Sequence, residues 1–203
     1  MLKPFSKYDI YGLLGLLRLI SYYTKTKILF PSARLIRFPI EIRGKKYIDF
    51  GLNLTTGKGC RIEAFPFYSK NIIVKFGNNV EINDYVHIAG ITSVNIGNNV
   101  LIASKVFISD IQHGCYSGEG LIHSSPYLSP NDRPLSAKPV IIEDNVWIGE
   151  SVSVIAGVTI GKGSIIGANS VVSKSLPPNI IAVGSPAKPI KEYNFDTQRW
   201  EKI

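Results

Sequence analysis

Three histidines carry the most recognisable chemistry in this chain of 203 residues: His87, His113 and His123. A neutral imidazole can accept a proton close to neutral pH, because the unperturbed pKa of histidine is about 6.5. His113 and His123 lie in a stretch rich in Ser, Pro and Gly, which is typical of a loop. The two cysteines, Cys60 and Cys115, are too few for a disulfide framework or a Cys-rich zinc site. Acid–base chemistry by histidine is therefore the first hypothesis.

The composition, 45% hydrophobic and 19% charged, indicates one domain with one core. The formal net charge is +8, but the excess is confined to residues 1–46, which hold ten basic and two acidic residues. The remaining chain holds thirteen of each sign and is neutral, so no nucleic-acid partner is expected. The start lacks the pattern of a secretory signal, and together with the low cysteine content this favours a cytoplasmic protein.

The basic segment is expected to contain a helix of about four turns. Ser6 could cap its first turn, where Asp9 would interact favourably with the helix dipole. The apolar run 10–20 is shorter than the roughly 20 residues that cross a bilayer. Two interpretations remain open. The helix packs on the main body or on another subunit, or it lies in a membrane interface beside anionic lipid.

A six-residue period in hydrophobicity runs from residue 50 to residue 172. The large residues that mark it, called anchors below, are Phe50, Thr56, Ile62, Phe76, Ile82, Ile88, Ile96, Ile102, Ile108, Ile142, Ile148, Val154, Ile160, Ile166 and Val172. Four positions after an anchor comes a smaller apolar or hydroxyl residue, as at Leu54, Cys60, Val80, Val86, Val100, Val106, Val146, Val152, Val158, Ser164 and Ser170, and less regularly at Thr92. Both sets are expected to point inward.

A period of six fits neither a helix nor a meander of hairpins. It fits a short strand followed by a corner, and three such sides close a coil of about eighteen residues whose strands pair in parallel with those of the next coil. Five glycines are assigned to the corners, where a residue without Cβ permits unusual backbone angles: Gly77, Gly97, Gly149, Gly161 and Gly167. The predicted fold is all-β, a parallel β-solenoid.

The period is interrupted once, between Ile108 and Ile142. Residues 109–139 should therefore leave the coil as a long protruding loop. The loop contains Pro126, Pro130, Pro134 and Pro139, which restrict its backbone, together with His113 and His123. A loop of this length and composition is interpreted as functional.

Several motifs stand out within this framework: Asp110-Ile111-Gln112-His113-Gly114, Asn145-Val146-Trp147-Ile148-Gly149, Gly184-Ser185-Pro186-Ala187-Lys188, Arg37-Phe38-Pro39 and Ile82-Asn83-Asp84-Tyr85-Val86-His87-Ile88. Together with the six-residue period, they resemble the motifs of the hexapeptide-repeat acyltransferases, in particular the sugar O-acetyltransferases of bacterial O-antigen and capsule synthesis. The resemblance implies a left-handed parallel β-helix, a homotrimer, and acyl-CoA bound in a groove between subunits. The expected divisions are a basic helical segment 1–46, a β-helix domain 47–189 that includes the loop, and a C-terminal tail 190–203.

The resemblance also implies roles for individual residues. His113 matches the general base, although many relatives have a second histidine where this chain has Ile111. The acceptor sugar is expected beside Asn83, Asp84 and His87, and His123 has no assigned role. Acetyl-CoA, the implied acyl donor, is expected beside Trp147, Gly149, Ala168, Ser173, Lys174 and Lys188, and no metal is implied.

The leading hypothesis is acetyl-CoA-dependent O-acetylation of a sugar in a surface polysaccharide or its lipid-linked precursor, in the cytoplasm or at the inner face of its membrane. N-acetylation of a nucleotide-linked amino sugar would use the same scaffold and base. The γ-type carbonic anhydrases share the solenoid and bind zinc through three histidines, but their two late ligands are closer together than the ten residues that separate His113 and His123. A non-catalytic solenoid would not require the loop, His113 and the closing motif together.

Overall fold

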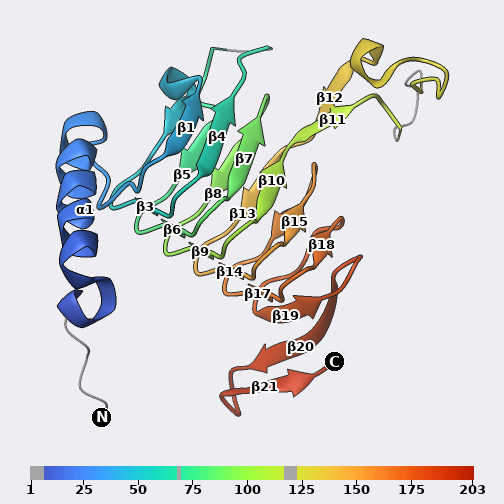
Figure 1. Ribbon diagram of the computed structural model, residues 1–203. Helices are drawn as coiled ribbons and strands as arrows, with labels where there is room; N and C mark the ends of the chain where they lie inside the picture. The colour runs from blue at the N-terminus through green and yellow to red at the C-terminus, as the bar shows by residue number, and fades with distance from the viewer. Residues whose placement is uncertain (1–6, 68–69, 117–122) are drawn as a thin grey trace.

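The computed structural model describes residues 7–67, 70–116 and 123–203. Three sheets of short strands form its main body, with the helix α1 (Lys7–Leu29) beside them and a separate two-stranded sheet projecting from them (Figure 1). The first sheet contains β1 (Ile40–Arg43), β4 (Cys60–Ala64), β7 (His87–Gly90), β10 (Phe107–Ser109), β15 (Ser153–Val154) and β18 (Val171–Val172). The second contains β2 (Ile48–Asp49), β5 (Val74–Phe76), β8 (Val94–Ile96), β13 (Val140–Ile142) and β16 (Thr159–Ile160). The third contains β3 (Thr55–Thr56), β6 (Glu81–Ile82), β9 (Leu101–Ile102), β14 (Trp147–Ile148), β17 (Ile165–Ile166) and β19 (Ile180–Val183). Within these sets the strands pair in parallel, and the chain visits the three sheets in turn.

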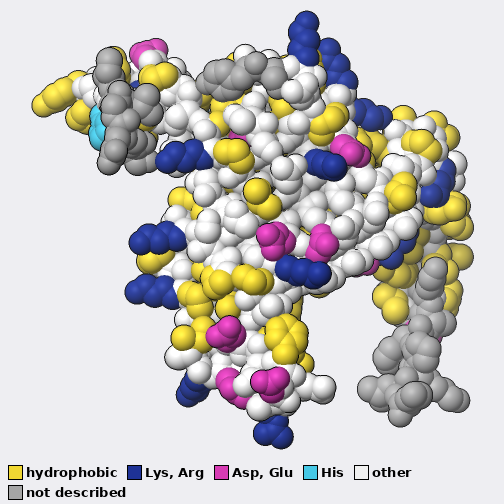
Figure 2. Space-filling model, turned by 180° about the vertical axis from the view of Figure 1, so that it is seen from behind, with side chains coloured by type: hydrophobic (Ala, Val, Ile, Leu, Met, Phe, Trp, Pro, Cys, Tyr) yellow, Lys and Arg dark blue, Asp and Glu magenta, His cyan; other side chains and the backbone are white. Residues whose placement is uncertain are grey.

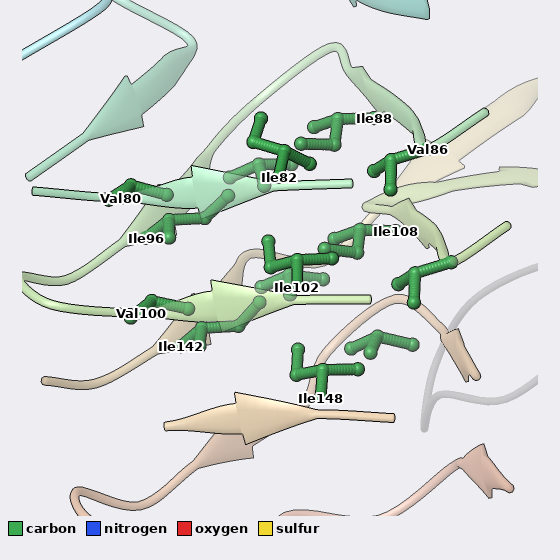
Figure 3. Close-up of a cluster of buried hydrophobic side chains, with 14 of the residues drawn as sticks. Val80, Ile82, Val86, Ile88, Ile96, Val100, Ile102, Ile108, Ile142 and Ile148 are labelled. Atoms are coloured by element: carbon green, nitrogen blue, oxygen red, sulfur yellow. The ribbon is translucent and has the colours of Figure 1, made fainter. Parts of the chain in front are cut away.

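The predicted anchors stack in register across successive coils, which confirms the period of six. In the third sheet, Ile82, Ile102 and Ile148 are direct neighbours, and Figure 3 shows them one above another. Ile88 and Ile108 are aligned in the same way in the first sheet. The alignment follows from strand geometry, because alternate side chains of a strand point to the same face.

The core is the column that these side chains fill. Every predicted anchor is buried except Phe50, which is half-buried and stacks on Phe76 with ring centroids 6.3 Å apart. The smaller residues four places on are buried as well, apart from Thr92, which is exposed. The step from Ile88 to Ile96 is eight residues rather than six, and within it Ile91 and Val94 face inward in place of Thr92. Burial of each Ile or Val contributes about 1.5–3 kcal/mol, and the column is therefore the main source of stability.

The glycines at the corners were expected to adopt unusual backbone angles, and the structure gives them a different role. At one corner of the coil, positive φ is adopted by a series of asparagines, including Asn79 (φ 57), Asn99 (φ 55) and Asn145 (φ 59). Their side chains form a ladder, in which Asn79 Nδ2 donates to Asn99 Oδ1 at 3.1 Å. Gly97 is needed for a different reason, since a Cβ there would lie 2.5 Å from Asp144 Oδ1 of the next coil. The assigned glycines thus permit close approach between coils and do not supply unusual backbone angles.

Helix α1 (Lys7–Leu29) is longer than the predicted four turns and contains a non-helical residue, Gly12 (φ 61, ψ 179). Ser6, the expected cap, lies outside the described residues. The later turns of α1 are attached to the chain that follows the helix through Thr26. This residue is fully buried, and its hydroxyl accepts a hydrogen bond from the backbone N–H of Ile36 at 2.8 Å. This tertiary contact extends the helix beyond the apolar run. Within the described part of the chain, no helix is both long and apolar enough to cross a membrane.

Some basic residues of the segment 1–46 attach it to the coil, and others make contacts within the segment. Arg34 pairs with Glu81 of β6 at 2.5 Å, and Arg37 Nη1 donates to the carbonyl oxygen of Thr56 at 3.0 Å. Lys45, in the 3-10 helix η1 (Lys45–Tyr47), donates to the Leu29 carbonyl at the end of α1 at 2.9 Å. A lysine at a helix C-terminus also interacts favourably with the helix dipole.

Two segments extend from the coil. Strands β11 (Ile111–His113) and β12 (Leu135–Ala137) form an antiparallel pair that projects away from the sheets, with the 3-10 helix η2 (Pro130–Asp132) near its far end (Figure 1). At the C-terminal end, β20 (Lys188–Asn194) and β21 (Arg199–Lys202) add to β19 as an antiparallel hairpin, so most of the expected tail is ordered as strands.

Candidate functional site

His113 is the last residue of β11 and its side chain is exposed. Its imidazole Nδ1 lies 3.3 Å from the carbonyl oxygen of Pro130. A carbonyl oxygen only accepts hydrogen bonds, so this contact requires the proton on Nδ1. In that tautomer Nε2 carries the lone pair and can accept a proton from a reacting hydroxyl.

Hydrogen bonds within the projecting hairpin hold the backbone around His113. The carbonyl oxygen of His113 accepts a hydrogen bond from the Tyr116 hydroxyl at 2.5 Å, and Arg133 Nη1 donates to that hydroxyl at 2.8 Å. Gly114 has φ of 107°, a conformation that favours glycine, and its carbonyl accepts from Ser136 Oγ at 2.6 Å. The hairpin is therefore a structured support for the imidazole.

Asp110 fixes the hairpin at its base, and sequence reasoning gave this residue no role. It is fully buried. Its carboxylate accepts backbone N–H bonds from Ile91 at 2.9 Å, Thr92 at 2.8 Å and Ser93 at 2.7 Å. The only signal in the sequence was the position of Asp110 within the Asp-Ile-Gln-His-Gly motif, since its partners lie in an earlier coil.

The expected acceptor residues lie around one corner of the coil. Asn83 and Asp84 are exposed between β6 and β7, and Asp84 Oδ1 accepts the backbone N–H of Lys58 at 2.7 Å. His87, at the start of β7, lines a cavity of about 450 Å³ that Arg61 and Tyr85 also line. His87 thus lies at an open cavity, whereas Asn83 and Asp84 are not among the residues that line it.

His87 is held by a charged cluster that sequence reasoning missed. Its Nε2 lies 2.8 Å from Oε2 of Glu63, whose side chain is only 5% exposed. Arg61 Nη2 lies 3.0 Å from the same nitrogen, and Arg43 Nη1 lies 2.9 Å from Glu63 Oε1, although without hydrogen-bond alignment. The cluster depends on the register that places Arg61 beside His87, which only the paired strands show.

The expected donor residues occupy the third sheet and the last coils. Trp147 points outward from β14 and is 49% exposed, next to Ile165 of β17. Gly149 and Ala168 are adjacent, since a Cβ at Gly149 would lie 2.6 Å from the Ala168 nitrogen. A side chain at Gly149 would therefore disturb the backbone at Ala168.

The cationic residues of this group lie near the end of the coil. Ser173 and Lys174 are exposed directly after β18, and Lys188 is exposed at the start of β20. The hydrogen bond from the Ala187 N–H to the Val171 carbonyl, 2.8 Å long, brings these two segments together. The structure therefore gathers Ser173, Lys174 and Lys188 in one region.

Donor and acceptor candidates are not gathered into one pocket of a single chain. The hairpin with His113 continues from β10 of the first sheet, whereas Trp147 lies on the outer side of the third. The cavity beside His87 is not lined by His113, and His123 is exposed. Across residues 7–67, 70–116 and 123–203 no three His, Cys, Asp or Glu side chains are grouped as they would be to hold a metal ion.

Comparisons with known proteins agree with this architecture. The family described as bacterial transferase hexapeptide (six repeats) matches residues 139–174. A protein of Escherichia coli K12, WbbJ, whose name assigns it O-acetyl transfer in lipopolysaccharide biosynthesis, is 47% identical over 192 residues and 95% of each chain. The galactoside O-acetyltransferase of the same organism is 35% identical over 77% of this chain and 72% of its own.

A solved structure shares the fold. The N-acyltransferase AntD from Bacillus cereus, in complex with dTDP and 3-hydroxybutyryl-CoA, superimposes with a TM-score of 0.68 and 22% identity over 87% of this chain and 92% of its own. At that identity the likeness concerns the fold, whereas the relatives above share the sequence along most of their length. The chain belongs to the hexapeptide-repeat acyltransferases.

Proposed function

We propose that the protein transfers an acetyl group from acetyl-CoA to a sugar hydroxyl in the synthesis of a bacterial surface polysaccharide. Two relatives with extensive sequence identity are named for O-acetyl transfer, one in lipopolysaccharide biosynthesis and one on galactosides. The structural observation that carries the proposal is the contact of His113 Nδ1 with the Pro130 carbonyl. It leaves Nε2 as the acceptor that this chemistry needs.

His113 is the general base in this proposal. Its Nε2 accepts the proton of the sugar hydroxyl as the hydroxyl oxygen attacks the thioester carbonyl carbon. The tetrahedral intermediate then collapses, the C–S bond breaks, and the imidazolium returns the proton to the departing thiolate. General base catalysis of this kind contributes about 10²–10⁴-fold to the rate.

The donor is assigned to the surface beside Trp147. The exposed indole offers an apolar face for the pantetheine arm, and Ala168, which Gly149 approaches closely, is exposed as well. Ser173, Lys174 and Lys188 lie where the nucleotide phosphates would be neutralised by charge and hydrogen bonds.

The acceptor is assigned to the corner formed by Asn83, Asp84 and His87. The exposed amide of Asn83 can donate to and accept from sugar hydroxyls, and the carboxylate of Asp84 can accept from them. His87 is oriented by Glu63 and Arg61, so it gives the cavity a ring of fixed orientation. No residue of this set replaces His113 as the base in the proposal.

We also propose that the coil is left-handed and that three copies assemble with the donor groove between them. The proposed division keeps the bounds expected from sequence, with a segment 1–46, a catalytic β-helix 47–189 carrying the loop 109–139, and a tail 190–203. The segment 1–46 is not wholly helical, because β1 (Ile40–Arg43) already pairs with β4 of the first sheet. The separation of His113 from Trp147 in one chain supports this assembly, because a neighbouring copy can bring the two groups together.

The N-terminal helix is proposed as a peripheral contact with the inner face of the cytoplasmic membrane. Its exposed large side chains include Tyr8, Ile10, Tyr11, Leu13, Leu14, Leu17, Ile20 and Tyr23, and Figure 2 shows hydrophobic side chains gathered along α1 at the right of the view. An apolar helix face with nearby basic residues suits the interface of an anionic bilayer. Contact with a second copy would be the competing result of the test given in the Discussion.

N-acetylation of a nucleotide-linked amino sugar is the second candidate, because AntD is an N-acyltransferase with the same fold. The sequence relatives favour a hydroxyl acceptor. The test is incubation with acetyl-CoA and a panel of nucleotide sugars, lipid-linked saccharides and polymers, with detection of free thiol and of one added acetyl group by mass spectrometry. Alkali-labile acetylation supports O-acetyl transfer, an alkali-stable product on an amino sugar supports the second candidate, and absence of transfer to the whole panel contradicts both.

A further inference from the structure

Asp110 is a buried carboxylate that connects the projecting hairpin to the coil. Charged groups are rarely buried unless several hydrogen bonds compensate for the lost water. Here three consecutive backbone N–H groups, those of residues 91–93, donate to the two carboxylate oxygens. Such charge-assisted bonds are stronger than neutral ones and define the position of the carboxylate closely.

Further hydrogen bonds beside Asp110 hold both strands of the hairpin at its base. The Asp110 carbonyl oxygen accepts the backbone N–H of Lys138 at 3.1 Å, where the returning strand rejoins the coil. On the outgoing strand, Ser109 Oγ accepts the N–H of Ile111 at 3.0 Å. His113 is three residues after Asp110, so a rotation at this base would displace the imidazole.

We infer that Asp110 is a positioning residue for His113, which sets the direction of the hairpin and thereby the place of the catalytic imidazole. The inference rests on the proposed function. It assigns Asp110 no contact with substrate, and its effect is transmitted through β11. A carboxylate is required because an amide in the same place would direct an N–H group at backbone N–H donors.

The kinetic test compares Asp110→Asn with Asp144→Asn. Asp144 is a matched control, because its Oδ1 also accepts a backbone N–H, that of Asn98 at 2.6 Å, but at a corner of the coil away from the hairpin. Asp110→Asn should lower kcat by about 10–100-fold and leave the KM for acetyl-CoA within twofold, whereas Asp144→Asn should retain kcat. A folded Asp110→Asn protein with more than half of wild-type kcat would overturn the inference.

A double-variant comparison tests whether the effect passes through His113. In a His113→Ala background, Asp110→Asn should change the residual turnover by less than twofold, because there is no imidazole left to position. A further tenfold loss would contradict the inference. If Asp110→Asn does not fold, Asp110→Glu takes its place, with the carboxylate retained but displaced by one methylene and with the same criteria.

A readout that needs no activity separates this inference from the proposed function. The ¹⁵N chemical shifts of the His113 ring should show the Nδ1–H tautomer in the wild-type protein and an averaged tautomer in Asp110→Asn. If the wild-type protein transfers no acetyl group but the shifts change in this way, the proposed function fails and the positioning role stands. Unchanged shifts in a folded Asp110→Asn protein would overturn the positioning role.

Discussion

The imidazole Nδ1 of His113 lies 3.3 Å from the carbonyl oxygen of Pro130, across the projecting hairpin. One residue ends β11 and the other begins η2, so the contact joins the two sides of the loop. It gives a neutral imidazole one tautomer and one orientation. A base that is already oriented avoids part of the entropic cost of reaching the reactive geometry.

The donor assignment predicts that Trp147→Ala raises the KM for acetyl-CoA about tenfold with little change in folding, because the indole is half exposed and lies outside the core. Steady-state kinetics and thermal unfolding measure the two effects. Ile141→Ala is the control, since Ile141 is also an exposed large side chain but lies on the second sheet. An unchanged KM in Trp147→Ala would remove the tryptophan from the donor site.

The close approach of successive coils predicts that Gly97→Ala lowers the free energy of unfolding by about 1–3 kcal/mol. The added Cβ would lie 2.5 Å from Asp144 Oδ1 and 2.8 Å from the Asp144 nitrogen, and the backbone cannot move aside alone. Gly167→Ala should cost less, because the nearest atom is a methyl group of Val183 at 2.7 Å. Urea unfolding ranks the two variants, and equal stability would contradict the explanation.

Burial raises the pKa of the Cys60 thiol above its ordinary value, and hydrogen bonds to nearby backbone only partly oppose that effect. The reactive thiolate is therefore scarce at Cys60, which is also inaccessible, whereas Cys115 in the hairpin is partly exposed. Alkylation of the native protein should modify Cys115 first and Cys60 only after unfolding. Peptide mass spectrometry at successive times measures both rates, and early labelling of Cys60 would indicate an open core.

The membrane proposal predicts that the full-length protein binds vesicles with anionic lipid at low salt and that Leu14→Glu reduces the bound fraction several-fold. Leu14 is 77% exposed on α1, so its replacement should not disturb the core. Phe195→Glu, at an exposed site of the C-terminal hairpin, is the control and should bind like wild type. Light scattering on the same proteins reports the number of subunits. Dissociation of the assembly by Leu14→Glu, without vesicle binding by wild type, would identify the helix face as a subunit contact.

The coil could be predicted closely from sequence because each anchor, such as Ile102 or Ile148, repeats a constraint set by strand geometry. The gap in that period predicted a departure from the coil between Ile108 and Ile142, and β11 and β12 lie in that interval. Side-chain interactions between successive coils could not be predicted from the sequence. The cluster around Glu63 depends on strand register, and the three N–H donors of Asp110 come from an earlier coil. Gly97 was placed at a corner correctly, but the reason given, an unusual backbone angle, was wrong. The actual reason is the close approach of Asp144 in the next coil, which the sequence does not reveal.

The most direct test of the central claim is the turnover of His113→Ala with acetyl-CoA and the best acceptor from the panel. His123→Ala is the matched control, since it removes an exposed histidine from the same loop. Without its base, His113→Ala should turn over about 10²–10⁴-fold more slowly than wild type, while its thermal unfolding and CoA binding are unchanged. His123→Ala should remain near wild type. Retention of more than a third of wild-type turnover by His113→Ala would contradict the assignment of His113 as the general base.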